Sequence, residues 1–421
     1  MKVLVVGGGG REHAICWKLA QSPKVTELYC APGNGGIAQV AQCVPIKATD
    51  VEGMVAWAKE HAMDFVMVAP DDPLALGMVD ALEAAGIPAF GPRANAAILE
   101  ASKAFSKELM KKYHIPTAQY ETFTDMEQAL AYIHRQGAPI VVKADGLALG
   151  KGVVVASTVE EAEEAVRSMM QDHKFGKSGS TVVIEECMVG PEVTVLAFCD
   201  GEHLVPMLSS QDHKRAYDGN QGPNTGGMGT VAPNPCYTED IARVCMDTIF
   251  LPTLAAMRAE SCPFKGCLYF GLMLTPNGPK VIEYNCRFGD PECQAVMPLL
   301  SGDLASFCLH GAKGEFTPEE ISFQNGWSVC CVLASKGYPE TSRSGDAIQG
   351  LDDVANASVY HAGTKWNADK NCYETNGGRV LAVVAQGESL SEARQRAHNE
   401  TKKVKFDGMQ RRPDIGFASF V

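Results

Sequence analysis

The chain has 421 residues, of which 46% are hydrophobic and 21% charged, and its formal net charge is −13 at pH 7. This length exceeds what one hydrophobic core supports, so we expect three or four domains of a soluble globular protein. Basic residues form only short pairs, such as 402–403 and 411–412, which argues against binding of nucleic acid or an acidic membrane. No segment approaches the roughly 18–20 apolar residues of a membrane span.

The fifteen cysteines indicate a reducing compartment rather than a disulfide framework or a zinc site. Their number is odd, none has C-x-x-C spacing, and most lie in apolar stretches such as 329–333. These features are typical of buried thiols in the cytosol. The apolar stretch 3–6 is far too short for a signal-peptide core. We therefore predict a cytoplasmic protein.

The first hundred residues alternate between short apolar strands and amphipathic helices. Strands are predicted at 2–6, 27–30, 65–69 and 89–90, and helices at 12–21 and 74–85. This rhythm predicts a doubly wound α/β domain with a parallel sheet. Ligands of such domains bind at the carboxyl ends of strands, so residues 7–11, 32–34 and 70–73 are expected to share one crevice.

The glycine run 7–10 invites comparison with dinucleotide-binding proteins. The G-x-G-x-x-G fingerprint requires glycine where Glu12 stands, and the second strand is followed by Cys30-Ala-Pro-Gly instead of an acid. Both departures argue against NAD binding. Gly9, Gly10 and Arg11 are candidates for binding a monophosphate at the start of the following helix. A tight strand–helix turn explains these residues equally well.

Lys143 directly follows the apolar segment 139–142, which is predicted to be a buried strand. A glycine-rich loop with a second lysine, Lys151, comes next. Cationic side chains, and backbone N–H groups that glycine leaves accessible, suit the phosphates of a nucleotide. The chain resumes as strand 153–156, which predicts a hairpin flap. A Walker loop is excluded because Val153 follows Gly152. The alternative is an ordinary hairpin with solvated lysines.

Glu283, Asn285 and Arg287 alternate along a predicted strand, so they share one face of it if the strand continues. Two oxygen ligands side by side suit Mg²⁺. A neighbouring guanidinium suits a carboxylate or an oxyanion that develops during acyl transfer. The alternative is a salt-bridge cluster of Arg287 with Asp290 and Glu292.

Further elements are predicted downstream of the first domain. Helix 102–113 carries Lys103 on its first turn, and Thr158 with Glu161 forms a capping box for helix 159–170. The last hundred residues contain predicted strands at 327–334, 359–362 and 379–385. Asn376-Gly377 predicts a hairpin turn, and Ser389 with Glu392 caps a final helix.

In combination, Lys143, the flap, residues 184–192 and Glu283-x-Asn285-x-Arg287 follow the order and spacing of the ATP-grasp superfamily. More specifically, the whole chain resembles the phosphoribosylamine–glycine ligase family of purine biosynthesis. The resembling motifs lie at residues 5–14, 31–34, 102–105, 210–215, 222–229, 283–292, 361–365, 375–379 and 414–416. The run 211–215 followed by 223–229 is the most specific of them.

The resemblance implies an α/β fold with α+β grasp lobes. A doubly wound N-terminal domain (1–101) precedes an ATP-grasp catalytic domain (102–122 and 191–318), a flap lobe (123–190) and a small C-terminal α/β domain (319–421). It implies ligation of glycine to 5-phosphoribosylamine through a glycyl phosphate, with ATP and Mg²⁺ or Mn²⁺. Only small-molecule partners and a monomer are expected.

The resemblance also implies roles for individual residues. Arg287 and Lys143 are the expected catalytic residues, and Glu283 and Asn285 the metal ligands. ATP is expected to contact Lys103, Lys143, Gly150, Lys151, Gly152, Glu185, Glu186, Cys187 and Glu192. Substrate binding is expected at Gly9, Gly10, Arg11, Asn34, Asp212, Lys214, Asn224, Thr225, Arg287 and Arg412.

One departure bears on the number of metals. Many superfamily members carry an acid on the preceding strand, where Gly271 stands here, so only two protein ligands are assigned. Two other classes stay open. A related ATP-grasp carboxylase would lack the motifs at 211–215 and 223–229. A non-catalytic nucleotide-binding subunit would be expected to have lost Lys143, Glu283 or Arg287.

Overall fold

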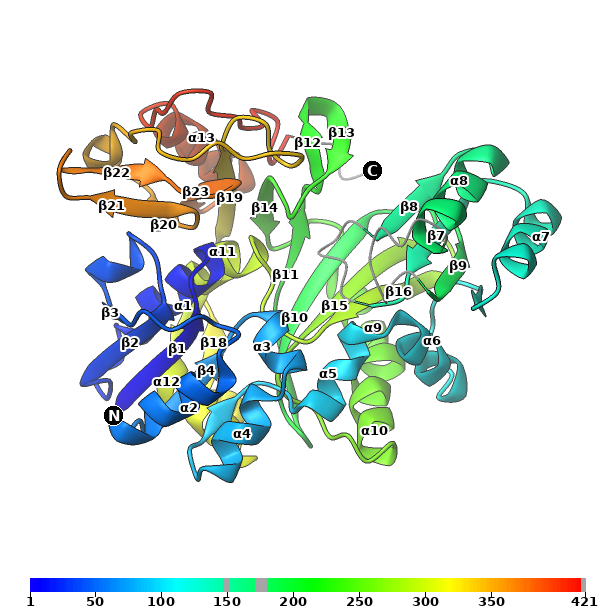
Figure 1. Cartoon of the computed structure of the whole chain (residues 1–421), viewed down its shortest axis with the longest axis horizontal. Coiled ribbons are helices and arrows are strands. Elements are labelled where there is room, and N and C mark those ends of the chain that lie inside the picture. Colours follow the sequence, from blue (N-terminus) through cyan, green and yellow to red (C-terminus); the bar gives the residue numbers. More distant parts are fainter. Residues whose placement is uncertain (147–151, 171–179, 418–421) are drawn as a thin grey trace.

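A computed structural model of the chain describes residues 1–146, 152–170 and 180–417. The N-terminal sheet has five parallel strands in the order β3-β2-β1-β4-β5 (Figure 1). They are β1 (Lys2–Gly7), β2 (Glu27–Pro32), β3 (Gln42–Cys43), β4 (Phe65–Val68) and β5 (Ala89–Phe90). Val3 and Val5 pack into one core cluster, and Leu4 and Val6 into another. Both faces are therefore covered, which confirms the doubly wound domain.

Helices α1 (Gly10–Leu19) and α2 (Val51–Glu60) connect these strands. The continuous helix predicted at 74–85 is wrong, because α3 (Asp71–Ala75) and α4 (Met78–Ala84) are separate. Gly77 divides them with φ +81°, a left-handed conformation that ends one helix and that glycine adopts at low cost.

A single antiparallel sheet of eight strands joins the middle of the chain to its C-terminal part. The order is β16-β15-β10-β11-β14-β19-β23-β20. The strands are β10 (Glu192–Asp200), β11 (Leu204–Asp212), β14 (Gly229–Ala232), β15 (Lys265–Thr275), β16 (Gly278–Asn285), β19 (Trp327–Ala334), β20 (Ser358–His361) and β23 (Arg379–Gly387). The C-terminal strands thus continue the sheet that carries Glu283.

A separate four-stranded sheet forms a lobe at the right of Figure 1, next to β16 of the large sheet. It has the order β6-β9-β7-β8, with β6 (Tyr120–Phe123), β7 (Ile140–Ala144), β8 (Val153–Ala156) and β9 (Val182–Glu186). Helices α7 (Met126–Gln136) and α8 (Val159–Met170) supply the rest of its core. The antiparallel pairing of β7 with β8 confirms the predicted hairpin. Gly150 and Lys151 lie outside the described residues.

The predicted helix caps are formed, whereas one predicted turn is not. Thr158 Oγ1 accepts from Glu161 N at 3.2 Å, and Ser389 Oγ accepts from Glu392 N at 3.2 Å ahead of α13 (Leu390–Thr401). The hairpin predicted at Asn376-Gly377 is wrong. These residues join β22 (Cys372–Thr375) to β23, and β22 pairs instead with β21 (Thr364–Asn367) in a separate sheet.

The remaining elements connect these sheets. The helices are α5 (Ala94–Ala101), α6 (Lys103–Lys112), α9 (Glu239–Cys245), a π-helical turn (Met246–Phe250), α10 (Leu251–Ala259), α11 (Glu292–Val296) and α12 (Leu304–Lys313). The short strands are β12 (Arg215–Tyr217), β13 (Gln221–Asn224), β17 (Leu300–Gly302) and β18 (Ile321–Phe323). Short 3-10 turns occur at 37–39, 218–220, 297–299, 318–320 and 351–353. Within the described ranges, no helix is long and apolar enough to cross a membrane.

A buried histidine contact joins α1 to β20, and so links the N-terminal domain to the C-terminal strands. His13 Nδ1 accepts from the backbone N–H of His361 at 2.7 Å, and the two rings lie 5.7 Å apart. Burial, with the neighbouring His361, lowers the pKa of His13 to about 3. Burial likewise lowers the pKa of His361 to about 4. Both rings are therefore neutral at pH 7.

This contact predicts a loss of stability in acid. Between about pH 6.5 and pH 3 the unfolded chain binds a proton at His13 that the folded chain does not bind, so stability falls with pH. At pH 5 protonation of His13 in the unfolded chain lowers the free energy of unfolding by about 2 kcal/mol. His13→Asn keeps an acceptor but cannot titrate, so it should show a smaller drop in unfolding midpoint between pH 7.5 and pH 5.

The control is His114→Asn, because His114 is exposed and its φ of +56° suits asparagine. This variant should keep the wild-type drop. An identical drop in wild type and His13→Asn would contradict the assignment.

Candidate active site

Lys143, Glu185 and Lys107 form a buried ion cluster between the lobe and the large sheet. Lys143 Nζ lies 3.0 Å from Glu185 Oε2 and donates to the carbonyl of Ile282 at 3.0 Å. Lys107 Nζ lies 3.2 Å from Glu185 Oε1. The three side chains are at most 4% exposed. Glu185 therefore balances one of two buried lysine charges, and the cluster keeps a net positive charge.

Lys107 was missed by the sequence analysis. It lies four residues after Lys103 on α6, on the same face of that helix, and this spacing was the available signal. Burial lowers the pKa of Lys107 to about 8 against the opposing effect of Glu185. Its Nζ also donates to Thr117 Oγ1 at 2.8 Å. The geometry makes it a positioning partner of Glu185.

Lys103 approaches the loop that follows β7. Its Nζ donates to the carbonyl of Gly146 at 2.8 Å, and Asp145 accepts from Ala104 N at 3.0 Å at the start of α6. Burial lowers the pKa of Lys103, Glu283 opposes this shift and Lys143 adds to it. The predicted neighbours Lys103 and Lys143 are thus brought together beside Glu283.

Glu283 and Asn285 lie two residues apart at the end of β16, as predicted. Burial alone would raise the pKa of Glu283, but Lys214, Lys143 and Lys103 hold it below its ordinary value. Gly271 pairs with Glu283 in the sheet, and a side chain at 271 would begin 3.2 Å from Glu283 Cγ. A side chain at 271 would therefore require Glu283 to shift slightly.

The donor set fits a hard divalent cation. A carboxylate and an amide oxygen are ligands that Mg²⁺ takes, with phosphates and water completing the shell. Within the described part of the chain, no group of three or more His, Cys, Asp or Glu side chains could hold a metal. Lys214 Nζ lies 4.0 Å from Glu283 Oε1.

Arg287 follows the end of β16, so it does not continue the strand as the alternation required. Its guanidinium nevertheless reaches Asn285 Oδ1 at 3.4 Å and Glu100 Oε1 at 3.4 Å. Its Nε is buried and has no hydrogen-bond partner among the described residues. Glu100, absent from the predicted site, also accepts from Cys286 N at 2.6 Å.

The salt-bridge alternative for Arg287 is wrong. Asp290 Oδ2 lies 3.3 Å from Arg379, and Glu292 accepts from the Tyr269 hydroxyl at 2.9 Å. Arg287 pairs with Glu100 instead.

The other described residues that were predicted to contact ATP have the following surroundings. Glu192 Oε2 is 3.3 Å from Lys214 Nζ, and Glu192 is the main cause of a pKa of Lys214 raised well above its ordinary value. Glu186 is exposed and lies 2.9 Å from Lys280. Cys187 follows β9 and is partly buried.

A pocket lies where the N-terminal strands meet the C-terminal part. It is lined by Gly8, Gly9, Gly33, Asn34, Asp290, Ala362, Gly363, Thr364, Asn376 and Arg379. The Asn34 side chain donates to the carbonyls of Gly8 at 2.9 Å and His361 at 2.8 Å. The predicted crevice therefore contains Gly9 and Asn34. Residues 70–73 do not line it.

Gly10 and Arg11 pack behind this pocket. Arg11 is 8% exposed, its Nε lies 2.6 Å from Glu12 Oε1, and it donates to the carbonyl of Phe288 at 3.1 Å. Glu12 in turn accepts from Gly9 N at 2.6 Å. Gly10 faces Gln294, whose Nε2 would lie 2.6 Å from an added Cβ. Gly10 and Arg11 therefore pack against the protein interior and do not line the pocket.

Arg412, expected from the resemblance to bind substrate, is buried and does not line the pocket with Gly9 and Asn34. Arg412 is 1% exposed and binds Asp414 through Nε at 2.8 Å and a terminal nitrogen at 2.6 Å. Its other terminal nitrogen donates to the carbonyl of Arg215 at 3.1 Å. The guanidinium at the pocket is that of Arg379, in the motif at 375–379.

Asp212, Lys214, Asn224 and Thr225 come together through a short connection. Thr225 donates to the carbonyl of Lys214 from its backbone N at 2.7 Å and from Oγ1 at 2.8 Å. Asn224 ends β13, which pairs with β12. The two motifs that were most specific in the sequence are thus in contact.

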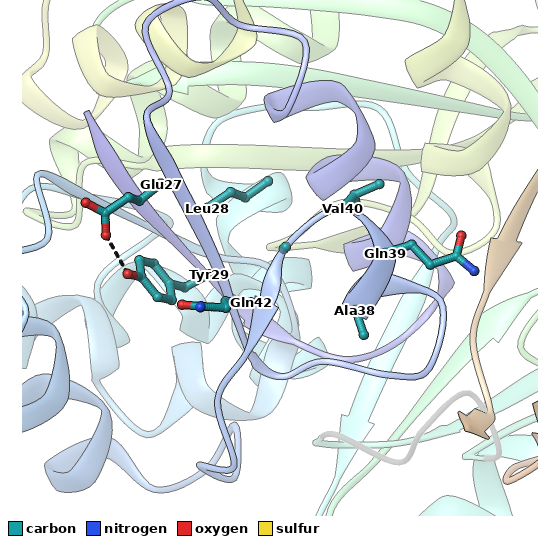
Figure 2. Close-up of a pocket in the computed structure, with 8 residues that line it drawn as sticks. Glu27, Leu28, Tyr29, Ala38, Gln39, Val40 and Gln42 are labelled. Carbon is teal, nitrogen blue, oxygen red and sulfur yellow. Dashed lines mark hydrogen bonds between the residues drawn. The ribbon is translucent and has the colours of Figure 1, made fainter. Parts of the chain in front are cut away.

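A separate hollow lies on the outer edge of the N-terminal sheet. Figure 2 shows Glu27, Tyr29, Gln39 and Gln42 around it. The Tyr29 hydroxyl donates to Glu27 Oε2 at 2.5 Å. No cationic side chain lines it, so we place the active site at the lysine and carboxylate cluster.

The fold and this cluster define an ATP-grasp architecture. The family model of the phosphoribosylglycinamide synthetase ATP-grasp (A) domain matches residues 101–293. The models of the N domain and the C domain of the same family match residues 1–100 and 328–418. The chain belongs to the phosphoribosylglycinamide synthetase family.

Individual relatives agree with this result. A phosphoribosylamine–glycine ligase of Vibrio vulnificus is 49% identical over 99% of this chain and 98% of its own length. One from Yersinia pestis is 47% identical over the same shares. The crystal structure of the Thermotoga maritima enzyme has a TM-score of 0.86 at 32% identity, covering 99% of this chain and 100% of its own. Campylobacter jejuni biotin carboxylase shares the fold, with a TM-score of 0.75 at 15% identity over 100% of this chain and 95% of its own.

The burial of Arg412 predicts a structural effect of its removal. Arg412→Ala removes the hydrogen bonds that this buried guanidinium donates to Asp414 and to the carbonyl of Arg215, and hydrogen bonds that involve charged groups contribute about 1.5–3 kcal/mol each. The thermal unfolding midpoint should therefore fall by several degrees. Arg243→Ala is the control, because that side chain is 71% exposed. A midpoint equal to wild type in Arg412→Ala would contradict this role.

Proposed function

We propose that the protein is an ATP-dependent carbon–nitrogen ligase that joins glycine to 5-phosphoribosylamine. The products are glycinamide ribonucleotide, ADP and phosphate, and the reaction belongs to purine biosynthesis. Membership of the family over nearly the whole chain carries this proposal. The buried cations beside Glu283 support it, because the reaction must bring several anions together.

In the proposed first step, the carboxylate of glycine attacks the γ-phosphate of ATP and forms glycyl phosphate. Lys103 and Lys143 reduce the repulsion between the two anions. Arg287 binds the glycine carboxylate, for which its unpartnered Nε offers a donor. Glu283 and Asn285 would hold Mg²⁺ or Mn²⁺, which when bound neutralises phosphate charge.

The four-stranded lobe is proposed to cover the nucleotide. Adenine lies against residues 185–187 and the ribose hydroxyls donate to Glu192. The loop 150–152 excludes water that would hydrolyse the acyl phosphate. The units 1–101, 102–122 with 191–318, 123–190 and 319–421 remain our proposed division of the chain. A cytoplasmic monomer is proposed.

The second substrate is proposed to bind between the pocket lined by Gly9, Asn34 and Arg379 and the charged cluster around Glu283. Gly9, Asn34 and Arg379 receive its phosphate, since a guanidinium and backbone N–H groups suit a dianion. Lys214, Asn224 and Thr225 are then close to its ribose. The amine thereby faces the acyl phosphate.

The direct test measures phosphate release from ATP with glycine alone, with 5-phosphoribosylamine alone, and with both. We expect rapid release only with both substrates, together with a stoichiometric amount of glycinamide ribonucleotide. Release that depends on bicarbonate instead would identify a carboxylase. No release under any condition would favour a nucleotide-binding subunit.

We expect that removal of the proposed metal-binding carboxylate, Glu283, lowers turnover without unfolding the protein. Glu283→Gln keeps the size of the side chain but weakens a metal ligand and removes the charge that faces three lysines. Ligation at saturating Mg²⁺ should fall at least about 100-fold, in line with the loss of several kcal/mol of charge stabilisation. Near-wild-type turnover would contradict the assignment. The control is Glu239→Gln, at an exposed position on α9.

A further inference from the structure

Asp212 is a carboxylate that no step above uses. It ends β11, and its Oδ1 is buried without a hydrogen-bond partner among the described residues. The side chain as a whole stays partly exposed. A buried oxygen without a partner is costly, so the position of this carboxylate calls for a function.

The surroundings leave room for this carboxylate. Gly227 has φ +117°, and an added Cβ there would lie 2.6 Å from Asp212 Oδ1 and 2.5 Å from Pro291 Cδ. The turn at Gly227 is held by Thr225, whose Oγ1 accepts from Gly227 N at 2.9 Å. A larger residue at 227 would fill the space beside the carboxylate.

Asp212 lies between the two halves of the site. Its electrostatic neighbours include Lys214 and Arg379. Lys214 reaches Glu283 at the nucleotide side, and Arg379 lines the pocket with Gly9 and Asn34. In the large sheet β11, which ends at Asp212, lies between β16, which carries Glu283, and β23, which begins at Arg379.

A second buried carboxylate increases the basicity of Asp212. Glu292 is 3% exposed and accepts from the Tyr269 hydroxyl, which in turn contacts Thr194 Oγ1 at 3.0 Å. Burial, together with the charge of Glu292, raises the pKa of Asp212 well above its ordinary value. A raised pKa makes a carboxylate a better proton acceptor near neutral pH.

His213, the neighbouring residue, is the other candidate base. Successive side chains on a strand point to opposite faces. The charged neighbours of His213 are Arg412 and Asp414, and its Nδ1 lies 3.1 Å from the carbonyl of Gly229. Burial lowers the pKa of His213 to about 4. The His213 side chain therefore faces away from the pocket and from the Glu283 cluster, and its ring is a poor proton acceptor.

We propose that Asp212 is the general base of the second step, the attack of the amine of 5-phosphoribosylamine on glycyl phosphate. This inference rests on the proposed ligase function. The amine nitrogen forms a bond to the acyl carbon, and one N–H proton passes to the Asp212 carboxylate. The C–O bond to phosphate breaks, and phosphate leaves with its electron pair. Asp212 later releases the proton to solvent.

The test separates the two steps in Asp212→Asn, which keeps the shape and removes the base. Hydroxylamine traps an acyl phosphate as a hydroxamate and needs little help from a base. Wild type and variant should form glycine hydroxamate from ATP and glycine at rates within about twofold. The kcat for ligation should fall about 100-fold or more, while KM for 5-phosphoribosylamine changes less than threefold. Asp240→Asn, whose side chain is 87% exposed, is the control.

Each other outcome overturns the proposal. Unchanged ligation would show that no base is needed at Asp212. A rise in KM with kcat unchanged would make it a binding residue. An equal loss of hydroxamate formation and ligation would show that Asp212 maintains the structure of the site and does not act as the base. Failure of the ligase function itself would be visible separately, as wild type that forms no ligation product.

Discussion

The placement of one charge, that of Lys143, underlies the rest of the site. Lys143 belongs to the four-stranded lobe, yet it contacts Glu185 on the next strand and the carbonyl of Ile282 on the large sheet. These contacts fix the lobe next to Glu283, one residue beyond Ile282. Lys107 and Lys143 share the single carboxylate of Glu185. Without Glu185 two buried cations would lie unpaired, which proteins avoid because unpaired burial of charge is costly. The residual positive charge faces the region where phosphates are proposed to bind.

The large sheet relates the two ends of the proposed reaction. Because β19, β20 and β23 continue the sheet that includes β15 and β16, Arg379 at the start of β23 is held relative to Glu283. The histidine contact between α1 and β20 then brings the glycine turn to the same pocket. Asp212 lies between these two positions. A ligase that handles a reactive acyl group needs such fixed geometry, since proximity of the reacting groups supplies much of the rate.

Much of the local structure was predictable, because it depends on neighbours in the sequence. Patterns within a few residues predict the hairpin of β7 and β8 and the helix caps at Thr158 and Ser389. They also predict that Glu283 and Asn285 lie two residues apart on one strand. Two of the failures involve distant partners, whereas the helix predicted at 74–85 fails locally, at Gly77. Asn376-Gly377 has the composition of a hairpin turn, but tertiary pairing assigns its flanking strands to different sheets. Arg412 is engaged by Asp414 and Arg215, whereas Arg379 reaches the pocket, and no local pattern distinguishes these two arginines. The family resemblance predicted the function.

The central claim is that the carboxylate of glycine attacks the γ-phosphate of ATP at this site. The most direct measurement follows ¹⁸O from carboxyl-labelled glycine during ligation. Because the proposed glycyl phosphate would pass one carboxyl oxygen to phosphate, one ¹⁸O atom should appear in each phosphate released, and one should remain in the amide product. Unlabelled phosphate formed together with glycinamide ribonucleotide would contradict the acyl phosphate route.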